Sequence, residues 1–165
     1  MGGIVLEKAK FNLRKEIEYV NKAFNIQTIT SKNTFSFSIE HQIPDTIIGD
    51  ITRYKQIIYN LLGNANKFTS NGEISLNISI VEKTESSILL LTQVKDNGIG
   101  MDNHEQEELF KPFSQSNQSI TRKYGGSGLG LTIAKKLSQV MGGDIQLKSE
   151  KGKGSCFRFT ILFGL

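Results

Sequence analysis

Two neighbouring segments with the patterns of β-strands constrain the fold of this 165-residue chain most strongly. Residues 73–82 (EISLNISIVE) alternate between apolar and polar side chains, the pattern of a strand with one buried face. Residues 88–96 (ILLLTQVKD) are more continuously apolar and indicate a more buried strand. The polar residues between these two segments are typical of a turn, so the pair predicts a β-hairpin.

Three long segments have the spacing of amphipathic helices, namely 11–24, 52–68 and 129–141. A short helix is expected at 104–110, and further strands at 34–40, 47–50, 144–150 and 155–163. This order predicts an α+β fold: a two-layer α/β sandwich with a mixed, mostly antiparallel sheet of about five strands and three main helices on one face. The length is that of one ordinary domain, so residues 1–165 are expected to form a single domain.

Composition and charge exclude several classes of protein. The net charge of +4 is mild and evenly spread, so we expect no nucleic-acid partner. A single cysteine, Cys156, excludes an internal disulfide and a metal site built from cysteines. The longest apolar run, residues 88–91, is far too short to span a membrane, and no signal peptide opens the sequence. We therefore expect a cytoplasmic domain without membrane contact.

Glycines crowd residues 125–130, within the stretch KYGGSGLGLTIAKK at 123–136. The stretch lacks the Gly-Lys-Ser/Thr of a P-loop and the preceding strand of a dinucleotide-binding motif. Backbone N–H groups at a helix start attract phosphate, and Arg122 and Lys123 lie just before the glycines. The motif therefore suggests either a phosphate-binding loop or a flexible hinge without a ligand.

Asn60, Asn64 and Lys67 share one face of the second long helix because they lie four and three residues apart. Amides among apolar residues are unfavourable unless they are paired. They could bond to neighbouring backbone, or they could form a ligand site. In the second case an amide oxygen would coordinate Mg²⁺ and the lysine would contact a phosphate.

Asp96 ends the buried strand at 88–96 and opens an Asp-x-Gly-x-Gly turn with Gly98 and Gly100. A carboxylate at this point is poorly solvated unless a donor such as the exocyclic amine of adenine reaches it. The glycines would let a base approach the backbone closely. A fourth motif, KGKGSCF at 151–157, is by itself a hairpin turn.

In combination and in this order, the motifs resemble the ATP-binding catalytic domain of sensor histidine kinases, which belong to the GHKL (Bergerat-fold) superfamily with gyrase, Hsp90 and MutL. The N, G1, F, G2 and G3 boxes of that family resemble NLLGNANKFTSNGEI (60–74), DNGIGM (96–101), LFKPFSQ (109–115), GGSGLGLTIAKKL (125–137) and GKGSCF (152–157). The sequence of residues 109–131 is most similar to the corresponding segment of hybrid histidine kinases. The resemblance covers residues 4–165.

The resemblance implies a domain that binds Mg-ATP and transfers the γ-phosphoryl group to a histidine. Asn64 would be the Mg²⁺ ligand, and the residues closest to the chemistry would be Asn60, Lys67 and Arg122. The nucleotide-binding residues would be Asn64, Lys67, Phe68, Asp96, Gly98, Gly100, Met101, Phe110, Phe113, Gly126, Ser127, Gly128, Leu129, Gly130, Leu131 and Ser155. Residues 101–127 would form an ATP lid anchored by its two phenylalanines.

Three positions depart from the family pattern. Asn66 occupies a usually aliphatic position, so that helix face is expected to be less buried, and Asn117 occupies a position that is often Asp in hybrid kinases. The related ATPases have Glu at the position of Asn60, where it activates water. Because asparagine cannot act as a base, we expect slow hydrolysis of ATP.

Neither His41 nor His104 matches the phosphoacceptor signature of sensor kinases. The expected partners are therefore a histidine-bearing dimerisation domain and, downstream, the receiver domain of a response regulator. Dimerisation normally resides in that separate domain, so we expect the isolated chain to be a monomer. Two alternatives remain: a non-catalytic nucleotide-sensing docking module, and a serine kinase of the same fold.

Overall fold

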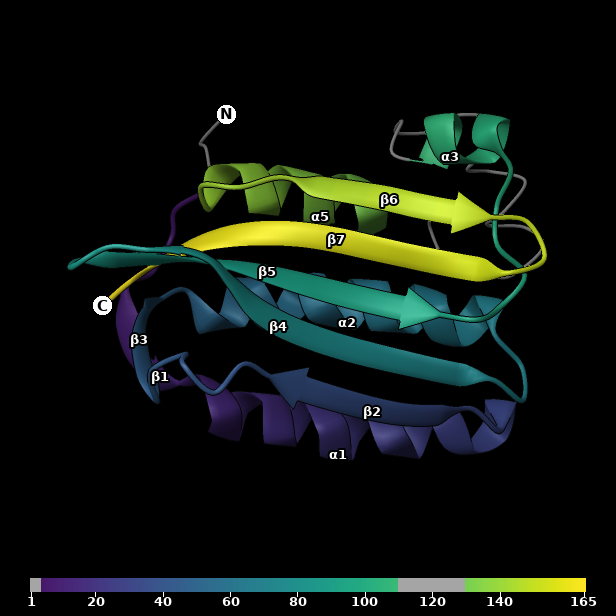
Figure 1. Cartoon of the computed structure of the whole chain (residues 1–165), viewed down its shortest axis with the longest axis horizontal. Helices are drawn as coiled ribbons and strands as arrows, with labels where there is room; N and C mark the ends of the chain where they lie inside the picture. Colours follow the sequence, from purple (N-terminus) through teal and green to yellow (C-terminus); the bar gives the residue numbers. More distant parts are fainter. Residues whose placement is uncertain (1–3, 110–129) are drawn as a thin grey trace.

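The fold consists of a sheet covered on one face by helices. The computed structural model describes residues 4–109 and 130–165 (Figure 1). The helices are α1 (Leu13–Ser31), α2 (Ile51–Phe68), α3 (Asn103–Leu109) and α5 (Gly130–Val140). The strands are β1 (Ala9–Asn12), β2 (Thr34–Ile39), β3 (Thr46–Gly49), β4 (Glu73–Lys83), β5 (Ser87–Asp96), β6 (Ile145–Glu150) and β7 (Gly154–Gly164). Figure 1 shows α1, α2 and α5 side by side behind the sheet, which confirms the predicted two-layer fold.

The sheet has the order β1-β3-β7-β5-β4-β2, and β6 pairs with β7. Among the described strands, β2 and β4 form the one parallel pair, and β4 and β5 form the predicted hairpin. The described residues contain seven strands, so the expectation of about five was too low. The difference includes β1, which has four residues and is therefore too short to show a clear alternation.

The core lies between the helices and the inner face of the sheet. The apolar residues that defined the first predicted helix, Leu13, Ile17, Val20 and Phe24, are all fully buried. Burial of each such side chain contributes about 1.5–3 kcal/mol, so this spacing dictates which helix face meets the sheet. None of the described helices combines the length and the apolar character that crossing a membrane would require.

Helix α1 begins at Leu13, two residues after the expected start at residue 11, and continues to Ser31, seven residues beyond the expected end at Phe24. The Asn12 side chain caps its start by accepting a hydrogen bond from the Lys15 backbone N–H at 3.1 Å. After Phe24 the apolar residues Ile26 and Ile29 are exposed, while Thr28 is buried. The periodicity of apolar residues therefore stops before the helix does.

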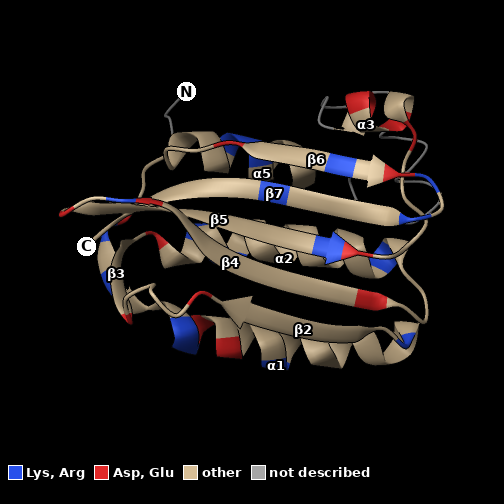
Figure 2. Ribbon diagram, viewed as in Figure 1, with Lys and Arg blue, Asp and Glu red and all other residues tan. Residues whose placement is uncertain are grey.

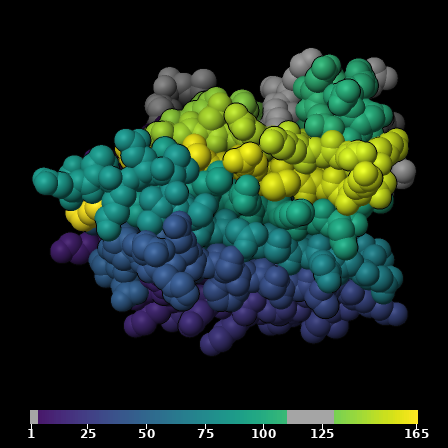
Figure 3. All heavy atoms as spheres, viewed as in Figure 1, coloured from purple at the N-terminus to yellow at the C-terminus, as the bar shows by residue number. Residues whose placement is uncertain are grey.

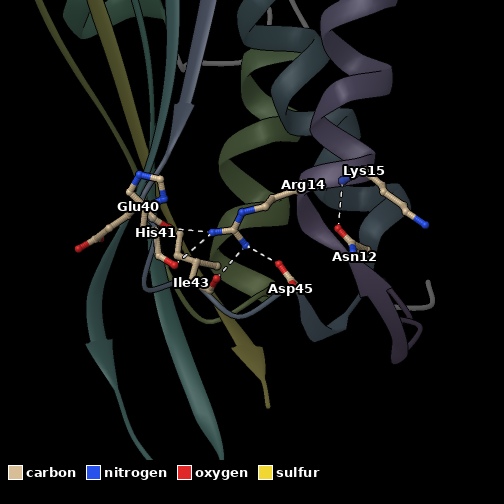
Figure 4. Close-up of polar contacts among 7 residues, drawn as sticks. All are labelled: Asn12, Arg14, Lys15, Glu40, His41, Ile43 and Asp45. Atoms are coloured by element: carbon tan, nitrogen blue, oxygen red, sulfur yellow. Dashed lines mark hydrogen bonds and ion pairs between the residues drawn. The ribbon is translucent and has the colours of Figure 1, made fainter.

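Arg14 fastens the start of α1 to the loop between β2 and β3 (Figure 4). Its guanidinium group donates hydrogen bonds to the carbonyl oxygens of Glu40 and Ile43, at 3.1 and 2.8 Å. It also forms an ion pair with Asp45 at 3.1 Å. These contacts hold the N-terminal end of α1 against the loop that leads from β2 into β3.

Candidate functional site

The polar face of α2 presents three of the predicted site residues. Asn60 donates a hydrogen bond from its side-chain nitrogen to the Gly130 carbonyl oxygen at 3.2 Å, which joins α2 to the start of α5. Asn64 and Lys67 form no hydrogen bond or ion pair with any described residue. The amide of Asn60 is therefore paired with backbone, as one of the two alternatives for this helix face predicted.

Asp96 lies at the end of β5 with only 5% of its surface exposed. One carboxylate oxygen accepts a hydrogen bond from the Gly98 backbone N–H at 2.9 Å. Burial raises the pKa of the Asp96 carboxyl, and this effect outweighs the opposing contributions of the Gly98 and Ser155 backbone and the Thr69 hydroxyl. The carboxyl group is thus a poorly solvated acceptor at the edge of the core.

The glycine turn after Asp96 packs against two other parts of the chain. The Ile99 N–H donates to the Phe68 carbonyl oxygen at 3.1 Å, and the Gly152 N–H donates to the Ile99 carbonyl oxygen at 2.7 Å. A Cβ atom at Gly98 would overlap that Phe68 oxygen, and one at Gly100, where φ is +67°, would overlap the Glu150 carbonyl oxygen. Gly98 and Gly100 therefore allow the backbone of neighbouring segments to pack closely against the turn. The close approach of an adenine base to these glycines remains a prediction.

Residues 101–109 are held against the hairpin of β6 and β7. The Met101 N–H donates to the Ser149 hydroxyl oxygen at 2.8 Å, and that oxygen lies 2.7 Å from the Ser155 hydroxyl oxygen. The Gln106 side chain donates to the carbonyl oxygens of Met101 and Ser149, both at 2.9 Å. These bonds fix the first part of the predicted lid to the sheet.

An ion pair between α3 and the turn of the β6–β7 hairpin adds to these hydrogen bonds. Figure 2 shows the acidic residues of α3 beside the lysine-bearing turn between β6 and β7, where Lys151 lies 3.7 Å from Glu105. In Figure 3 the atoms of α3 lie directly against that hairpin. The Glu105 N–H also donates to the Asp102 carboxylate at 2.8 Å, and this contact lowers the pKa of Asp102.

A polar cluster that the sequence analysis did not identify as part of the site supports the loop between α2 and β4. The Asn33 side chain donates to the Thr69 carbonyl oxygen and to the Asn66 side-chain oxygen, and it accepts a bond from the Gly72 N–H, each at 2.9 Å. Asn66 is half-buried, as expected for a polar residue at that position, and also accepts a 2.6 Å bond from the Ser31 hydroxyl. This cluster joins the end of α1 to the end of α2 and to the loop that follows it.

Sequence reasoning missed Thr69, Ser149 and Gln106 as residues near the site. Ser149 could have been found, because it follows Ile145 and Leu147 at alternate positions on the inner face of β6. Thr69 and Gln106 have no comparable signal, since their neighbours come from distant segments. Thr69 is only 4% exposed, and its hydroxyl lies beside the buried Asp96 carboxyl, whose pKa it lowers.

The remaining predicted residues divide into two groups. Gly130 begins α5 and Leu131 is buried in its first turn. The others, and most of the predicted lid at 101–127, lie outside the described residues: Phe110, Phe113, Arg122, Gly126, Ser127, Gly128 and Leu129. Within the described ranges, no group of three or more His, Cys, Asp or Glu side chains is arranged to hold a metal ion.

Comparisons with known proteins identify relatives of the whole chain. The family model for histidine kinase-, DNA gyrase B- and HSP90-like ATPases matches residues 49–164. The signal transduction histidine-protein kinase BarA of Escherichia coli K12 is 38% identical over 160 residues, which cover 97% of this chain and 17% of BarA. The chain thus spans about a sixth of the length of this relative.

Three solved structures have the same fold. Full-length ShkA in complex with AMPPNP superposes with a TM-score of 0.84 and 27% identity, over 99% of this chain and 32% of ShkA. The nucleotide-free catalytic domain of the histidine kinase ThkA gives a TM-score of 0.73 and 28% identity, over 94% of this chain and 95% of that domain. ThkA in complex with the response regulator protein TrrA is also similar, with a TM-score of 0.70 and 26% identity, over 96% of this chain and 42% of the ThkA chain. The fold is that of a histidine kinase catalytic domain.

Proposed function

This chain belongs to the family of histidine kinase-, DNA gyrase B- and HSP90-like ATPases, and from this premise we propose that it binds Mg-ATP and transfers the γ-phosphoryl group to a histidine on a separate domain. The acceptor would be a dimerisation domain of the parent kinase. A response regulator would receive the phosphoryl group next, in two-component signalling. Residues 1–165 would act as a single catalytic domain in the cytoplasm.

The observation that carries this proposal is the convergence of three motifs on the second half of α2. Asn60 contacts Gly130, which ends the glycine-rich motif 70 residues later in the sequence. The Phe68 carbonyl oxygen meets the glycine turn after Asp96. Motifs that are weak signals separately are therefore neighbours in space, around two polar side chains that have no described partner.

The residues present fit Mg-ATP in three respects. Asp96 offers a buried carboxylate to the adenine amine, and Asn64 and Lys67, which have no partner among residues 4–109 and 130–165, offer an amide oxygen to Mg²⁺ and an ammonium group to the phosphates. Bound Mg-ATP supplies the transferable phosphoryl group and the neutralising cation. The protein's task is then to position the nucleotide and to complement its charge.

Asn60 distinguishes this site from that of a hydrolysing ATPase. Its amide can donate and accept hydrogen bonds but cannot take a proton from water. The site would therefore hold ATP intact until an acceptor histidine arrives. This suits a transferase whose acceptor lies on another domain.

Calorimetric titration with a non-hydrolysable ATP analogue, with and without Mg²⁺, tests the nucleotide site. We expect binding that strengthens with Mg²⁺, and Asn64→Ala should abolish the gain from Mg²⁺ because the amide oxygen is lost. Asn25→Ala is a matched control, since Asn25 is an exposed asparagine on α1 whose side chain bonds to Asn21 on the same helix, far from the site. Absence of binding by the unaltered chain would contradict the proposal.

Phosphoryl transfer is tested with the histidine-bearing helical domain of the parent kinase. We expect acid-labile phosphohistidine to form on that domain in the presence of Mg-ATP. Binding of ATP without transfer to the correct acceptor would instead indicate a non-catalytic docking module. Phosphate on a serine of the acceptor would indicate a serine kinase of the same fold.

A further inference from the structure

The outer face of the sheet carries a group of cationic side chains on β5, β6 and β7. In Figure 1 the helices α1, α2 and α5 lie behind the sheet, and Figure 2 shows Lys and Arg residues on these three strands. Lys95 and Lys148 are exposed, and Arg158 is half-buried. None of the three forms a hydrogen bond or an ion pair with a residue in 4–109 or 130–165. The described part of the chain therefore does not neutralise these charges.

The register of the strands gathers these cations around one residue, Cys156. Lys95 of β5 and Lys148 of β6 are both paired with Cys156 of β7, and Arg158 follows two residues later on the same face. Neighbouring strands lie about 5 Å apart, so the row from Lys95 to Lys148 extends over about 10 Å. Burial raises the pKa of the Cys156 thiol, and the charges of Arg158, Lys95 and Lys148 oppose that rise. All three cations therefore act on the same point of the surface.

A hollow of about 300 Å³ lies at this row, and its lining includes Lys95, Lys148, Lys153 and Cys156. Glu150 also lines the hollow and forms an ion pair with Lys153 at 3.4 Å. Lys95 and Lys148 are thus the cations that a partner would meet here. A carboxylate side chain in this hollow would pair with ammonium groups from two strands.

The same face becomes apolar toward the other end of the sheet. Leu91 and Leu89 continue the outward-facing positions of β5, and Leu89 is paired with Leu162 of β7. Leu162 is 49% exposed, and the two leucines of β5 are half-buried. Apolar side chains beside a charged border are typical of protein interfaces. Nucleic acid would instead require a more extensive basic surface.

We propose that this outer face of β5, β6 and β7 is a docking surface for an acidic protein surface that belongs to another domain of the parent kinase. Its carboxylates would lie over Cys156 and its apolar side chains over Leu91 and Leu162. Opposite charges complement each other across protein interfaces, and here the cations are still unneutralised. The chain spans about a sixth of the length of BarA, and further domains of such a protein would supply the partner. The inference rests on the part of the proposed function that makes this chain one domain of a larger kinase.

Cys156 is the single cysteine of the chain, so its alkylation reports whether this face is covered. The rate of its reaction with iodoacetamide is measured by mass spectrometry of the peptide that contains it, in the isolated chain and in the parent kinase. We expect the reaction to be about tenfold slower in the parent kinase, because docking limits access to the thiol. High salt should remove this protection, since it screens the charges that attract the partner.

Charge reversal tests whether the partner is acidic. Lys148→Glu places a carboxylate where the partner's carboxylate would lie, so the protection in the parent kinase should be lost. The same variant of the isolated chain provides the reference rate, because the new charge also alters the reactivity of the thiol itself. Lys22→Glu is the matched control, since Lys22 is an exposed lysine on α1, behind the sheet. This variant should keep the protection.

Three results would overturn the inference. Equal rates in the isolated chain and the parent kinase would mean that no domain covers this face. Protection that survives Lys148→Glu and high salt would mean that the cover is not acidic. Protection of the isolated chain by phosphatidylserine vesicles, with none in the parent kinase without vesicles, would assign the face to an anionic membrane. Calorimetry of the parent kinase with a non-hydrolysable ATP analogue tests the proposed function separately, so that failure of either one is recognised by itself.

Discussion

At the scale of single residues, the site contains polar groups that folding alone does not satisfy. Asp96 is buried where its charge is poorly solvated, and Asn64 and Lys67 have no described partner. In the core, by contrast, the buried hydroxyls of Tyr54 and Thr92 pair with each other. This contrast separates residues held for stability from residues available for binding, and each kind makes its own prediction.

The substitution Asp96→Asn should stabilise the nucleotide-free domain at neutral pH and weaken its binding to ATP. Because burial raises the pKa of Asp96 in the folded state, the unfolded chain loses its proton first as the pH rises. The free energy of unfolding of the wild-type domain therefore falls as the pH rises above the ordinary pKa of aspartate. Asparagine still accepts from the Gly98 N–H but presents a donor to the adenine amine, so affinity should fall more than tenfold.

Urea denaturation of both proteins from pH 4 to pH 8 measures this effect. The difference in free energy of unfolding should favour the asparagine variant more as the pH rises, and it should vanish at the acid end. All other carboxyl groups are common to the two proteins and cancel in the difference. A difference independent of pH would show that burial does not perturb Asp96.

The substitution Tyr54→Phe should destabilise the domain without affecting nucleotide binding. Tyr54 is fully buried, and burial raises the pKa of its hydroxyl, which therefore stays protonated in the working pH range. Its removal leaves the Thr92 hydroxyl without a partner, which costs about 1–3 kcal/mol. Adding Thr92→Val should recover part of this loss. A double-mutant cycle by denaturation measures the coupling, and strictly additive losses would contradict the pairing.

At the scale of elements, the sequence predicts what hydrophobic periodicity can encode. The strands β4, β5, β6 and β7 match the expected segments within two residues at each end, because each alternates or is continuously apolar. Periodicity does not encode β1, which is too short, or the second half of α1, where the outer apolar residues are exposed. These segments are fixed by pairing and capping with distant residues.

The same limit applies to the candidate site. Asn60, Asn64 and Asp96 are recognisable because each is a polar residue inside an otherwise apolar pattern. Ser149 pairs with Met101 and Gln106 across 48 and 43 residues of sequence, and no local pattern predicts these pairings even though alternation places Ser149 on the inner face of its strand. The sequence therefore predicts the residues offered to a ligand better than the residues that support them.

The substitution Gln106→Ala should loosen α3 from the β6–β7 hairpin while leaving the rest of the fold intact. Gln106 donates one hydrogen bond to the Ser149 carbonyl oxygen in β6 and another to the carbonyl oxygen of Met101, whose own N–H donates to the Ser149 hydroxyl. Loss of both should raise the rate of local opening, and hence amide exchange in residues 101–109, about tenfold. Hydrogen exchange followed by mass spectrometry measures this rate.

Gln139→Ala is the control for this experiment. Gln139 is an exposed glutamine on α5 whose side chain makes one long, 3.4 Å contact with Asp144. Exchange in residues 101–109 should be unchanged in this variant. Equal exchange in both variants would mean that Gln106 does not hold α3 in solution.

At the scale of the whole molecule, one core is shared by every layer of the fold. Buried residues of α1, α2, α5 and the sheet belong to a single apolar cluster, so no part of it can separate without exposing the rest. Small domains with one core unfold in a single cooperative step. The candidate site lies at the junction of α2, β5, β7 and α5, and a ligand bound there would stabilise all of them together.

Thermal unfolding should therefore show one transition that nucleotide shifts as a unit. At an ATP concentration 100 times the dissociation constant, ligand binding adds about 2.7 kcal/mol of stability. For a chain of 165 residues this raises the midpoint by about 5–10 °C. Circular dichroism of the helices and of the aromatic core should report the same midpoint with and without nucleotide. Two separate transitions, or a shift confined to one signal, would show that residues 1–165 do not behave as one domain.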